Sequence, residues 1–319
     1  MSVRVRPAGD DDDDLAAIAA IVNAVTPDDP TSIDELRWTD RTYPGGARFL
    51  AEAEPGHAVA AAIVGRIHIF PPDFDGLWAT IKVLPDARRQ GTGSRLLAAV
   101  SEHARSCAKT ALHIPASEAA PQSIAFLIHR GFAEYDRVMA VRLDLGGLAE
   151  PPIEPPRGIA LTTLADRPDL VAGVHAVAVE AFADIPVSDE PIAAGDLAEF
   201  RARDVDRANI PPDAFFVGIE ATTGAVVGYA SLFLPGMPGA VVGWHDMTAV
   251  ARRWRGRGLA GALKRATIGW AIRNGVAALE TGNDADNAPM RAVNARLGYR
   301  PLPDYVTMRG PLFGGIMDR

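Results

Sequence analysis

The second half of the sequence repeats a pattern of the first half at a constant shift of 167 residues (Val83 to Val250). The aligned pairs are Val83 and Val250, Arg88 and Arg255, Gly91 and Gly258, Gly93 and Ala260, and the dipeptides Gly131-Phe132 and Gly298-Tyr299. Between Val83 and Phe132 the alignment needs no gap. Self-similarity over this length indicates two copies of one folding unit rather than two unrelated surface turns.

The repeat predicts an N-terminal domain over residues 1–147 and a C-terminal domain over residues 158–319. The segment between them, 148–157, contains Pro151, Pro152, Pro155 and Pro156 and is predicted to be a semi-rigid linker. In both halves strand-like runs alternate with helical patterns, and a strand, a loop and a helix lie at the centre of each half. These patterns predict an α/β fold with a mixed α+β sheet, present twice.

The centre of the second copy is a basic, glycine-rich turn, Trp254 to Gly261 (WRGRGLAG). It lies between a strand-like run, Ala240 to Val250, and a helical pattern, Leu259 to Arg273. Glycines allow the backbone to turn tightly, and the N–H groups at a helix N-terminus attract anions. Because Arg255 and Arg257 add positive charge, the turn is predicted to bind a phosphate or pyrophosphate group.

Two familiar phosphate loops fit this turn poorly. A Walker loop ends in Gly-Lys-Ser/Thr, which the turn lacks. The dinucleotide pattern G-x-G-x-x-G occurs at Gly256, Gly258 and Gly261, with Glu280 near the place of a ribose-binding acid. A dinucleotide turn follows a buried apolar strand directly, however, and the charged run 251–255 intervenes here. A dehydrogenase is therefore the weaker hypothesis, and failure to bind NAD would exclude it.

The run Val250, then Arg255-x-x-Gly258-x-Ala260, resembles the R/Q-x-x-G-x-G/A acyl-CoA loop of the GNAT (GCN5-related) N-acetyltransferase superfamily. Asn287 and Leu297-Gly298-Tyr299 extend the resemblance. It implies two tandem GNAT folds and acetyl-CoA as the acyl donor, with no metal. The cofactor-binding residues that it implies are Val250, Arg255, Gly256, Arg257, Gly258, Leu259, Ala260 and Asn287, with Val83, Arg88, Gly91 and Gly93 in the first half.

Direct transfer from a thioester to an amine requires a base that takes a proton from the amine. Several members of the family that this chain resembles place the base four or six residues before the valine, which makes Asp246 the first candidate. Strand alternation predicts that Trp244, Asp246 and Thr248 share one face and that His245 faces the other layer. Asp246 as a structural partner of an arginine is the alternative. The gapless alignment matches this face to Leu77, Ala79 and Ile81, and the fallback bases are Glu180, Asp184 and Glu280.

The position from which many family members protonate the thiolate with a tyrosine holds Asn294 here, and Leu127 in the first half. Asparagine donates a hydrogen bond but supplies no proton, so solvent or another residue must do so. The second half therefore keeps the loop, a candidate base and the distal asparagine, whereas the first half keeps the loop alone. The C-terminal domain is predicted to be catalytic and the N-terminal domain degenerate, either binding acyl-CoA without turnover or serving as a structural partner.

Composition limits the partners. The net charge of −8 favours an amine substrate over nucleic acid, and 48% hydrophobic with 23% charged residues is typical of a globular protein. The single cysteine, Cys107, and the absence of a long apolar run predict a cytoplasmic protein without a membrane partner. The acceptor is expected to be a small-molecule or peptide amine recognised by the segment 184–212, and the protein a monomer or homodimer. The alternatives are a tandem acetyltransferase similar to mycothiol synthase, and a non-catalytic acyl-CoA-binding module.

Overall fold

The computed structural model describes residues 3–67, 69–71, 73–185, 192–234 and 241–314. The chain divides into two compact units. The first comprises Met1–Arg137 and Asp304–Arg319, and the second comprises Val138–Pro303. Within the described residues, no helix is both long and apolar enough to span a bilayer.

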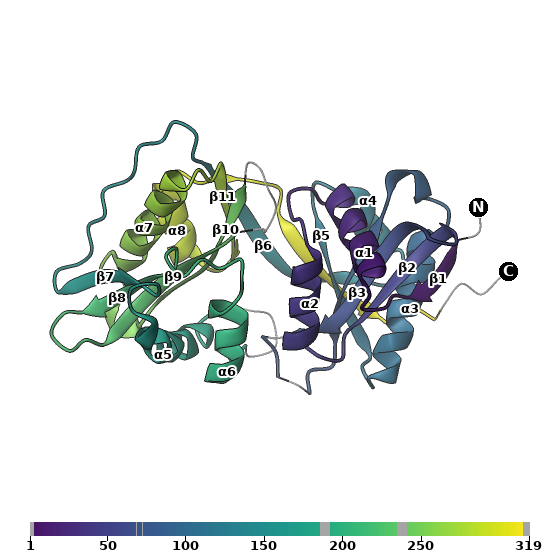
Figure 1. Ribbon diagram of the computed structural model, residues 1–319, viewed down its shortest axis with the longest axis horizontal. Helices are drawn as coiled ribbons and strands as arrows, with labels where there is room; N and C mark the ends of the chain where they lie inside the picture. Colours follow the sequence, from purple (N-terminus) through teal and green to yellow (C-terminus); the bar gives the residue numbers. More distant parts are fainter. Residues whose placement is uncertain (1–2, 68, 72, 186–191, 235–240, 315–319) are drawn as a thin grey trace. The chain divides into compact units, whose positions relative to one another are not determined.

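The first unit is a mixed sheet with helices on both faces (Figure 1). Its strands lie in the order β1 (Arg4–Pro7), β2 (Ala47–Glu54), β3 (His57–Arg66), β4 (Leu77–Val83), β5 (Ala111–Ser117) and β13 (Tyr305–Pro311). Its helices are α1 (Asp12–Val25), α2 (Ile33–Thr42), α3 (Thr92–Ser106) and α4 (Pro121–Ile128), with a short 3-10 turn, η1 (Pro85–Ala87). Side chains alternate across β3, so Ala61 packs with α1 and α2 while Ala60 and Ala62 pack with α3.

Helix α1 begins at an acidic N-cap. Asp11 accepts a hydrogen bond from the backbone N–H of Asp14, as the side chain of an N-cap residue does. The carboxylate of Asp14 is itself largely buried and accepts two hydrogen bonds from the Arg6 guanidinium, at 2.8 and 2.6 Å. These bonds, together with one from the backbone of Gly9, lower the pKa of Asp14 below its ordinary value. The entry of the chain into α1 is therefore tied to strand β1.

The second unit repeats this architecture. Its strands lie in the order β7 (Ile159–Thr163), β8 (Phe216–Glu220), β9 (Val226–Phe233), β10 (Val242–Val250), β11 (Ala278–Asp284) and β6 (Ala133–Asp144), and β12 (Arg300–Pro301) pairs with β6. Figure 1 shows α7 (Leu259–Arg273) and α8 (Ala288–Arg296) on one side of this sheet, and α5 (Val171–Phe182) and α6 (Leu197–Phe200) on the other. The remaining short turns are η2 (Pro168–Leu170), η3 (Arg201–Val205) and η4 (Arg252–Trp254).

Several sequence predictions concern residues in this unit. The predicted start of the central strand at Ala240 lies outside the described residues, and so does the part of the acceptor segment at 186–191. Within the segment 184–212, α6 is a single α-helical turn that continues as a π-helical turn, η3. The proline-rich segment 148–157 has no helix or strand, as its prolines predict.

In both units the two central parallel strands pair briefly and then separate. Strands β4 and β5 pair at Leu77–Leu112 and Trp78–His113, and β10 and β11 pair from Val242–Ala278 to Trp244–Glu280. Each strand continues beyond its last pair, where it stays bonded to its other neighbour. The result is a wedge-shaped opening in the sheet, which lies beside the start of the helix that follows the glycine turn.

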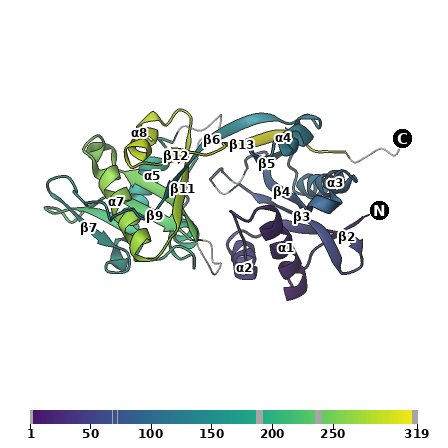
Figure 2. The same cartoon turned by 90° about the horizontal axis from the view of Figure 1, so that it is seen from above.

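The two sequence halves exchange their last strands. Strand β6 begins in the first unit, and its residues Val138–Asp144 pair with β11 in the second. Strand β13 returns to the first unit and pairs with β5 from Tyr305–Ser117 to Pro311–Ala111, which Figure 2 shows from above. The compact units thus differ from the sequence repeats, and the domains 1–147 and 158–319 remain a proposal about the repeats. Either strand has the alternation that completes either sheet, so sequence alone does not reveal the exchange.

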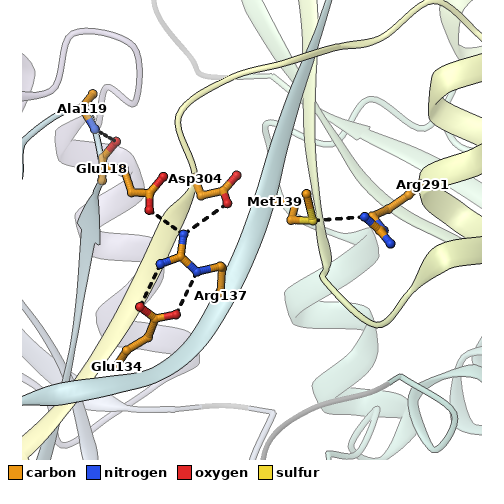
Figure 3. A network of polar contacts seen from close by, with 8 residues as sticks. Glu118, Ala119, Glu134, Arg137, Met139, Arg291 and Asp304 are labelled. Carbon is orange, nitrogen blue, oxygen red and sulfur yellow. Dashed lines mark hydrogen bonds and ion pairs between the residues drawn. The ribbon is translucent and has the colours of Figure 1, made fainter.

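Arg137 holds the points where the chain leaves and re-enters the first unit. Its guanidinium contacts Glu134 at 2.8 Å, Glu118 at 2.5 Å and Asp304 at 3.3 Å (Figure 3). The backbone N–H of Glu118 also donates to the carbonyl of Asp304. Within the second unit, Arg291 of α8 donates to the sulfur of Met139 in β6. Side-chain contacts in each unit therefore secure an exchanged strand.

Candidate functional site

The basic turn of the second unit forms an open helix N-terminus. The chain leaves β10, passes through the 3-10 turn Arg252–Trp254, and enters α7 through Gly258, whose φ of +87° lies in the left-handed region. Among the described residues no side chain caps this end, so the N–H groups of the first turn of α7 lack a side-chain acceptor. Arg255 donates from Nε to the carbonyl of Val250 at 2.8 Å, which fixes the loop to the end of β10. This arrangement suits an anion at Leu259 and Ala260.

The loop of the first unit has the same geometry. Gly91 begins α3 with a φ of +82°, and Arg88 donates from Nε to the carbonyl of Val83 at 2.9 Å. The repeat in the sequence is therefore also a repeat in hydrogen bonding.

Two features distinguish the first loop from the second. Arg89 takes the left-handed conformation (φ +62°) that Gly256 takes in the second loop, a conformation that costs a residue with a side chain more than glycine. The ring of Phe126, from α4, lies beside Gly93, where an added Cβ would be 3.4 Å from it, about van der Waals contact. An aromatic ring therefore lies against the part of the first loop that matches Ala260.

The fallback bases are engaged in other contacts. Asp184 accepts hydrogen bonds from Arg252 and Arg255, the latter at 2.7 Å, and these bonds hold its pKa well below the ordinary range. Glu180 accepts from the backbone N–H of Arg252. Glu280 is paired with Arg142 at 2.8 Å. All three carboxylates are thus engaged with an arginine, and the contacts of Asp184 tie the glycine-rich loop to the end of α5.

Strand β10 contains a β-bulge at Asp246 and Met247. His245 pairs with Leu232 and Thr248 pairs with Ala230, so two residues of β10 stand opposite Ser231 of β9. Bulges of this kind redirect side chains and are frequent beside active sites. The shift places Thr248 on the same face as His245, because Ala230 and Leu232 share a face. The expectation that Thr248 lies beside Asp246 was therefore wrong.

The first unit has no counterpart of this bulge. Strand β4 pairs with β3 in continuous register from Leu77 to Val83. The last parallel pairs, Trp78–His113 and Trp244–Glu280, show that Trp78 corresponds to Trp244, one residue away from the gapless alignment. Matching Asp246 to the face of Leu77, Ala79 and Ile81 was therefore also wrong, because the bulge inserts one residue into the second copy.

Asp246 lies among polar groups on the face that α5 and α6 cover. Its Oδ2 is 3.5 Å from Ser231 Oγ. The side chain of Asp246 is exposed at the surface, although protein atoms surround it on several sides. This desolvation, reinforced by the charge of Asp204 in η3, raises the pKa of Asp246 to about 6. A carboxylate with such a pKa is both ionised at neutral pH and a useful proton acceptor.

The groups around Asp246 form a mixed acidic and basic cluster. Asp204 is ion-paired with Arg203 at 2.6 Å, and burial raises the pKa of its carboxyl. Tyr229, on β9, is fully buried, and its hydroxyl has no hydrogen-bond partner among the described residues. A buried hydroxyl of this kind has unused capacity for a ligand or an ordered water. The face of the sheet that carries Asp246 therefore also carries an unused hydrogen-bonding group on β9.

His245 faces the opposite layer, as predicted, and is buried against α7. Its Nδ1 lies 2.9 Å from Tyr299 Oη, and its Nε2 lies 2.8 Å from Thr267 Oγ1. Because Thr267 donates its proton to the carbonyl of Lys264, His245 donates from Nε2 and accepts at Nδ1. Burial lowers its pKa well below the ordinary value. His245 is therefore a neutral structural residue.

Asn294 and Asn287 both lie on α8 but differ in surroundings. Asn287 is the N-cap residue, and its Oδ1 accepts from the N–H of Met290 at 3.3 Å. Asn294 is buried and accepts from Lys264 Nζ at 2.8 Å while donating to Asn283 Oδ1 at 2.7 Å. Sequence reasoning missed Lys264. The available signal was its position: Lys264 directly follows Leu263 and lies on the core-facing side of α7.

Both halves of the chain match models of one acetyltransferase family. A model of the acetyltransferase (GNAT) family matches residues 179–299, and a model of the acetyltransferase (GNAT) domain matches residues 45–134. Each match includes one glycine turn and the strand before it. No curated protein matches the chain.

Solved structures share the whole arrangement at low sequence identity. A tandem GNAT protein from the clavulanic acid biosynthesis pathway, 21% identical, has a TM-score of 0.77 over 99% of this chain and 100% of its own. A GCN5-related N-acetyltransferase from Sphaerobacter thermophilus, also 21% identical, has a TM-score of 0.71 over 98% of this chain and 97% of its own. A glucosamine N-acetyltransferase region of a fungal multi-domain β-N-acetylglucosaminidase, 15% identical, has a TM-score of 0.68 over 97% of this chain and 38% of its own. At these identities the likeness concerns the fold alone.

Proposed function

The chain belongs to the GNAT acetyltransferase family, with two tandem family domains, and we propose that its C-terminal half transfers an acetyl group from acetyl-CoA directly to a primary amine. The single observation that carries this proposal is the bulge of β10, which presents a solvent-accessible carboxylate with a raised pKa. The bulge lies within the same strand that leads into the glycine-rich loop, four residues before Val250, and strand β4 of the first unit has no equivalent.

Acetyl-CoA is proposed to bind along the loop and the opening between β10 and β11. The pyrophosphate would accept hydrogen bonds from the N–H groups of residues 256–260 at the positive end of α7, with Arg255 and Arg257 adding charge. The pantetheine arm would continue past Val250 into the opening, with Asn287 at its edge. In the first half, Val83, Arg88, Gly91 and Gly93 keep the loop, and Phe126 packs over it. We therefore propose that the first half is a structural partner.

Asp246 is proposed to act as the general base. It takes a proton from the ammonium of the acceptor, directly or through a water. The neutral amine then attacks the thioester carbonyl, and the C–S bond breaks with its electron pair moving to sulfur. With a pKa of about 6, the carboxylate is about nine-tenths ionised at pH 7. Asn294 provides a hydrogen bond on the thiolate side but no proton.

The acceptor is proposed to be a cationic small molecule or a peptide N-terminus. The carboxylates of Asp246 and Asp204 favour a positively charged group, and the net charge of −8 acts in the same direction at long range. A cytoplasmic location, with its reducing conditions, is proposed from the single cysteine. We also propose that the protein is a monomer or homodimer and that it binds neither nucleic acid nor a membrane.

A screen of primary amines with acetyl-CoA tests this function. The assay follows release of the CoA thiol in the presence of polyamines, amino acids, aminoglycosides and short peptides, each with the wild type and with Asp246→Asn. The proposal predicts amine-dependent release by the wild type and a loss of about 10²–10⁴-fold in the variant. Equal release by both proteins would exclude Asp246 as the base. Binding of acetyl-CoA without any turnover across the screen would favour the non-catalytic acyl-CoA-binding module.

A further inference from the structure

A buried lysine lies at the junction of α7, α8 and β11. Lys264 is 2% exposed, and its Nζ donates to Asn294 Oδ1 at 2.8 Å. Asn294 in turn donates to Asn283 on β11. The Nζ also lies 5.2 Å from the centre of the Tyr299 ring. Within the part of the chain that the structure describes, no carboxylate forms an ion pair with Lys264.

Burial of an unpaired lysine in a core is unfavourable in free energy. An ammonium removed from water without a counter-ion is strongly disfavoured, and an apolar side chain of similar length would pack there without that cost. Burial accordingly lowers the pKa of Lys264 to about 7. The titratable groups that face it are His245 of β10 and Tyr299, and both stay neutral, because burial lowers the pKa of the first and raises that of the second. Lys264 therefore gains or loses a proton near neutral pH without a partner to compensate.

The place of this group in the fold connects it to the opening in the sheet. Strands β10 and β11 part after Trp244 and Glu280, and Asn283 lies three residues further along β11. The hydrogen-bonded amides of Asn283 and Asn294 thus join α8 to the wall of the opening. Lys264 lies in the same helix as the anion-binding loop, six residues after Gly258, or about 9 Å along the axis. A thioester that enters the opening from the loop would pass Asn283, which is the residue that links this junction to the opening.

We propose that Lys264 is the proton donor for the thiolate of CoA, held in position by Asn294. This inference rests on the proposed function. When the C–S bond breaks, its electron pair stays on sulfur. An N–H bond of the Lys264 ammonium then breaks, an S–H bond forms, and CoA leaves as the thiol. Lys264 is left as a neutral amine, the form that its surroundings favour, and it recovers a proton from solvent after CoA departs. Asp246 has meanwhile taken the proton of the acceptor, so the two proton transfers balance.

The experiment uses free CoA, so it requires no knowledge of the acceptor. A cation beside the sulfur stabilises the thiolate, and an opposite charge at such a distance lowers a pKa by about one to three units. The pKa of the bound CoA thiol is measured by the ultraviolet absorbance of the thiolate during a pH titration, in the wild type and in Lys264→Met. The proposal predicts that it is about one to three units lower in the wild type than in the variant.

Two further variants make the result specific. Lys82→Met removes a half-buried lysine from β4 of the first unit, and it should leave the thiol titration unchanged. Lys264→Arg keeps the charge but does not release a proton, since the pKa of arginine exceeds 12. It should retain the lowered thiol pKa and lose turnover with any amine that the wild type accepts.

The outcomes separate this inference from the proposed function. Calorimetry with acetyl-CoA is run on each protein first. If the wild type binds no CoA, the proposed function fails and this inference fails with it. If Lys264→Met binds CoA with the wild-type thiol pKa, Lys264 does not face the sulfur, and this inference alone is overturned. Full activity of Lys264→Arg would also overturn it, since a fixed charge would then suffice. If Lys264→Met does not fold, Lys264→Arg supplies the comparison.

Discussion

The exchange of strands makes a specific prediction about where a mutation acts. Met308, in the last strand of the sequence, is 2% exposed and belongs to the core of the first unit, where it pairs with Ile114. Met308→Ala removes three heavy atoms from that core and should cost about 2–5 kcal/mol. Because whole domains are stable by about 5–15 kcal/mol, such a loss is large enough to follow locally.

Hydrogen exchange followed by mass spectrometry locates this effect. A loss of 2 kcal/mol speeds exchange through local opening about thirtyfold, since each 1.4 kcal/mol is a factor of ten. For Met308→Ala the faster exchange should appear in peptides of β5 and α3, which are distant in sequence, and peptides of α7 and β11 should keep their protection. Leu143→Ala is the matched control. Leu143 lies in β6, pairs with Leu279 and packs in the core of the second unit, so its variant should show the opposite pattern.

Reversed patterns would contradict the exchange of strands. Faster exchange in β11 and α8 for Met308→Ala, with β5 unchanged, would mean that each sequence half keeps its own last strand. The boundary of the compact units would then coincide with the proline-rich segment 148–157.

Three shorter predictions concern carboxylates. Asp246→Asn should abolish the acid limb of the pH–rate profile, because the wild-type rate with an accepted amine should fall about tenfold per pH unit below about 6 as the base is protonated; an unchanged limb would refute the assignment. Asp184→Asn frees Arg255 and Arg252 and should tighten acetyl-CoA binding about two- to fivefold by calorimetry, whereas Asp169→Asn, in another exposed arginine pair, should not. Asp14→Asn should destabilise the first unit by about 1.5–3 kcal/mol at pH 7 in urea unfolding. The folded state depresses the pKa of Asp14, so the difference in unfolding free energy is present above the unfolded-state pKa of about 4. The difference should disappear as the pH falls through the folded-state pKa, and a pH-independent difference would contradict this prediction.

Local signals in the sequence predicted the elements that depend on them. The two glycine turns were visible because a left-handed N-cap and an exposed loop favour glycine at fixed places, and Gly91 and Gly258 adopt that conformation. His245 was predicted to face the other layer from strand alternation alone, and it does. These predictions require only neighbours in sequence and the period of the element.

The features that the sequence did not reveal depend on contacts between elements that are distant in sequence. The bulge at Asp246 is defined by the single residue, Ser231, that faces two residues of β10, and no local pattern reveals that count. The exchange of β6 and β13 involves two strands with similar alternation, either of which satisfies either sheet. Lys264 was hidden for a related reason: a long side chain on an amphipathic helix is expected to reach solvent, and only the packing of α8 shows that it does not.

The central claim is that the C-terminal loop alone binds the acyl donor. Isothermal calorimetry with acetyl-CoA on the wild type, Gly258→Glu and Gly91→Glu tests it most directly. The two glycines are matched, because both begin a helix with a φ near +85° and in both cases a new side chain has open space. Gly258→Gln controls for backbone strain, since it has the same bulk as the glutamate variant without the charge. We predict one site per chain, which is lost in Gly258→Glu, weakened less in Gly258→Gln and kept in Gly91→Glu. Two sites, or a single site lost only with Gly91→Glu, would contradict it.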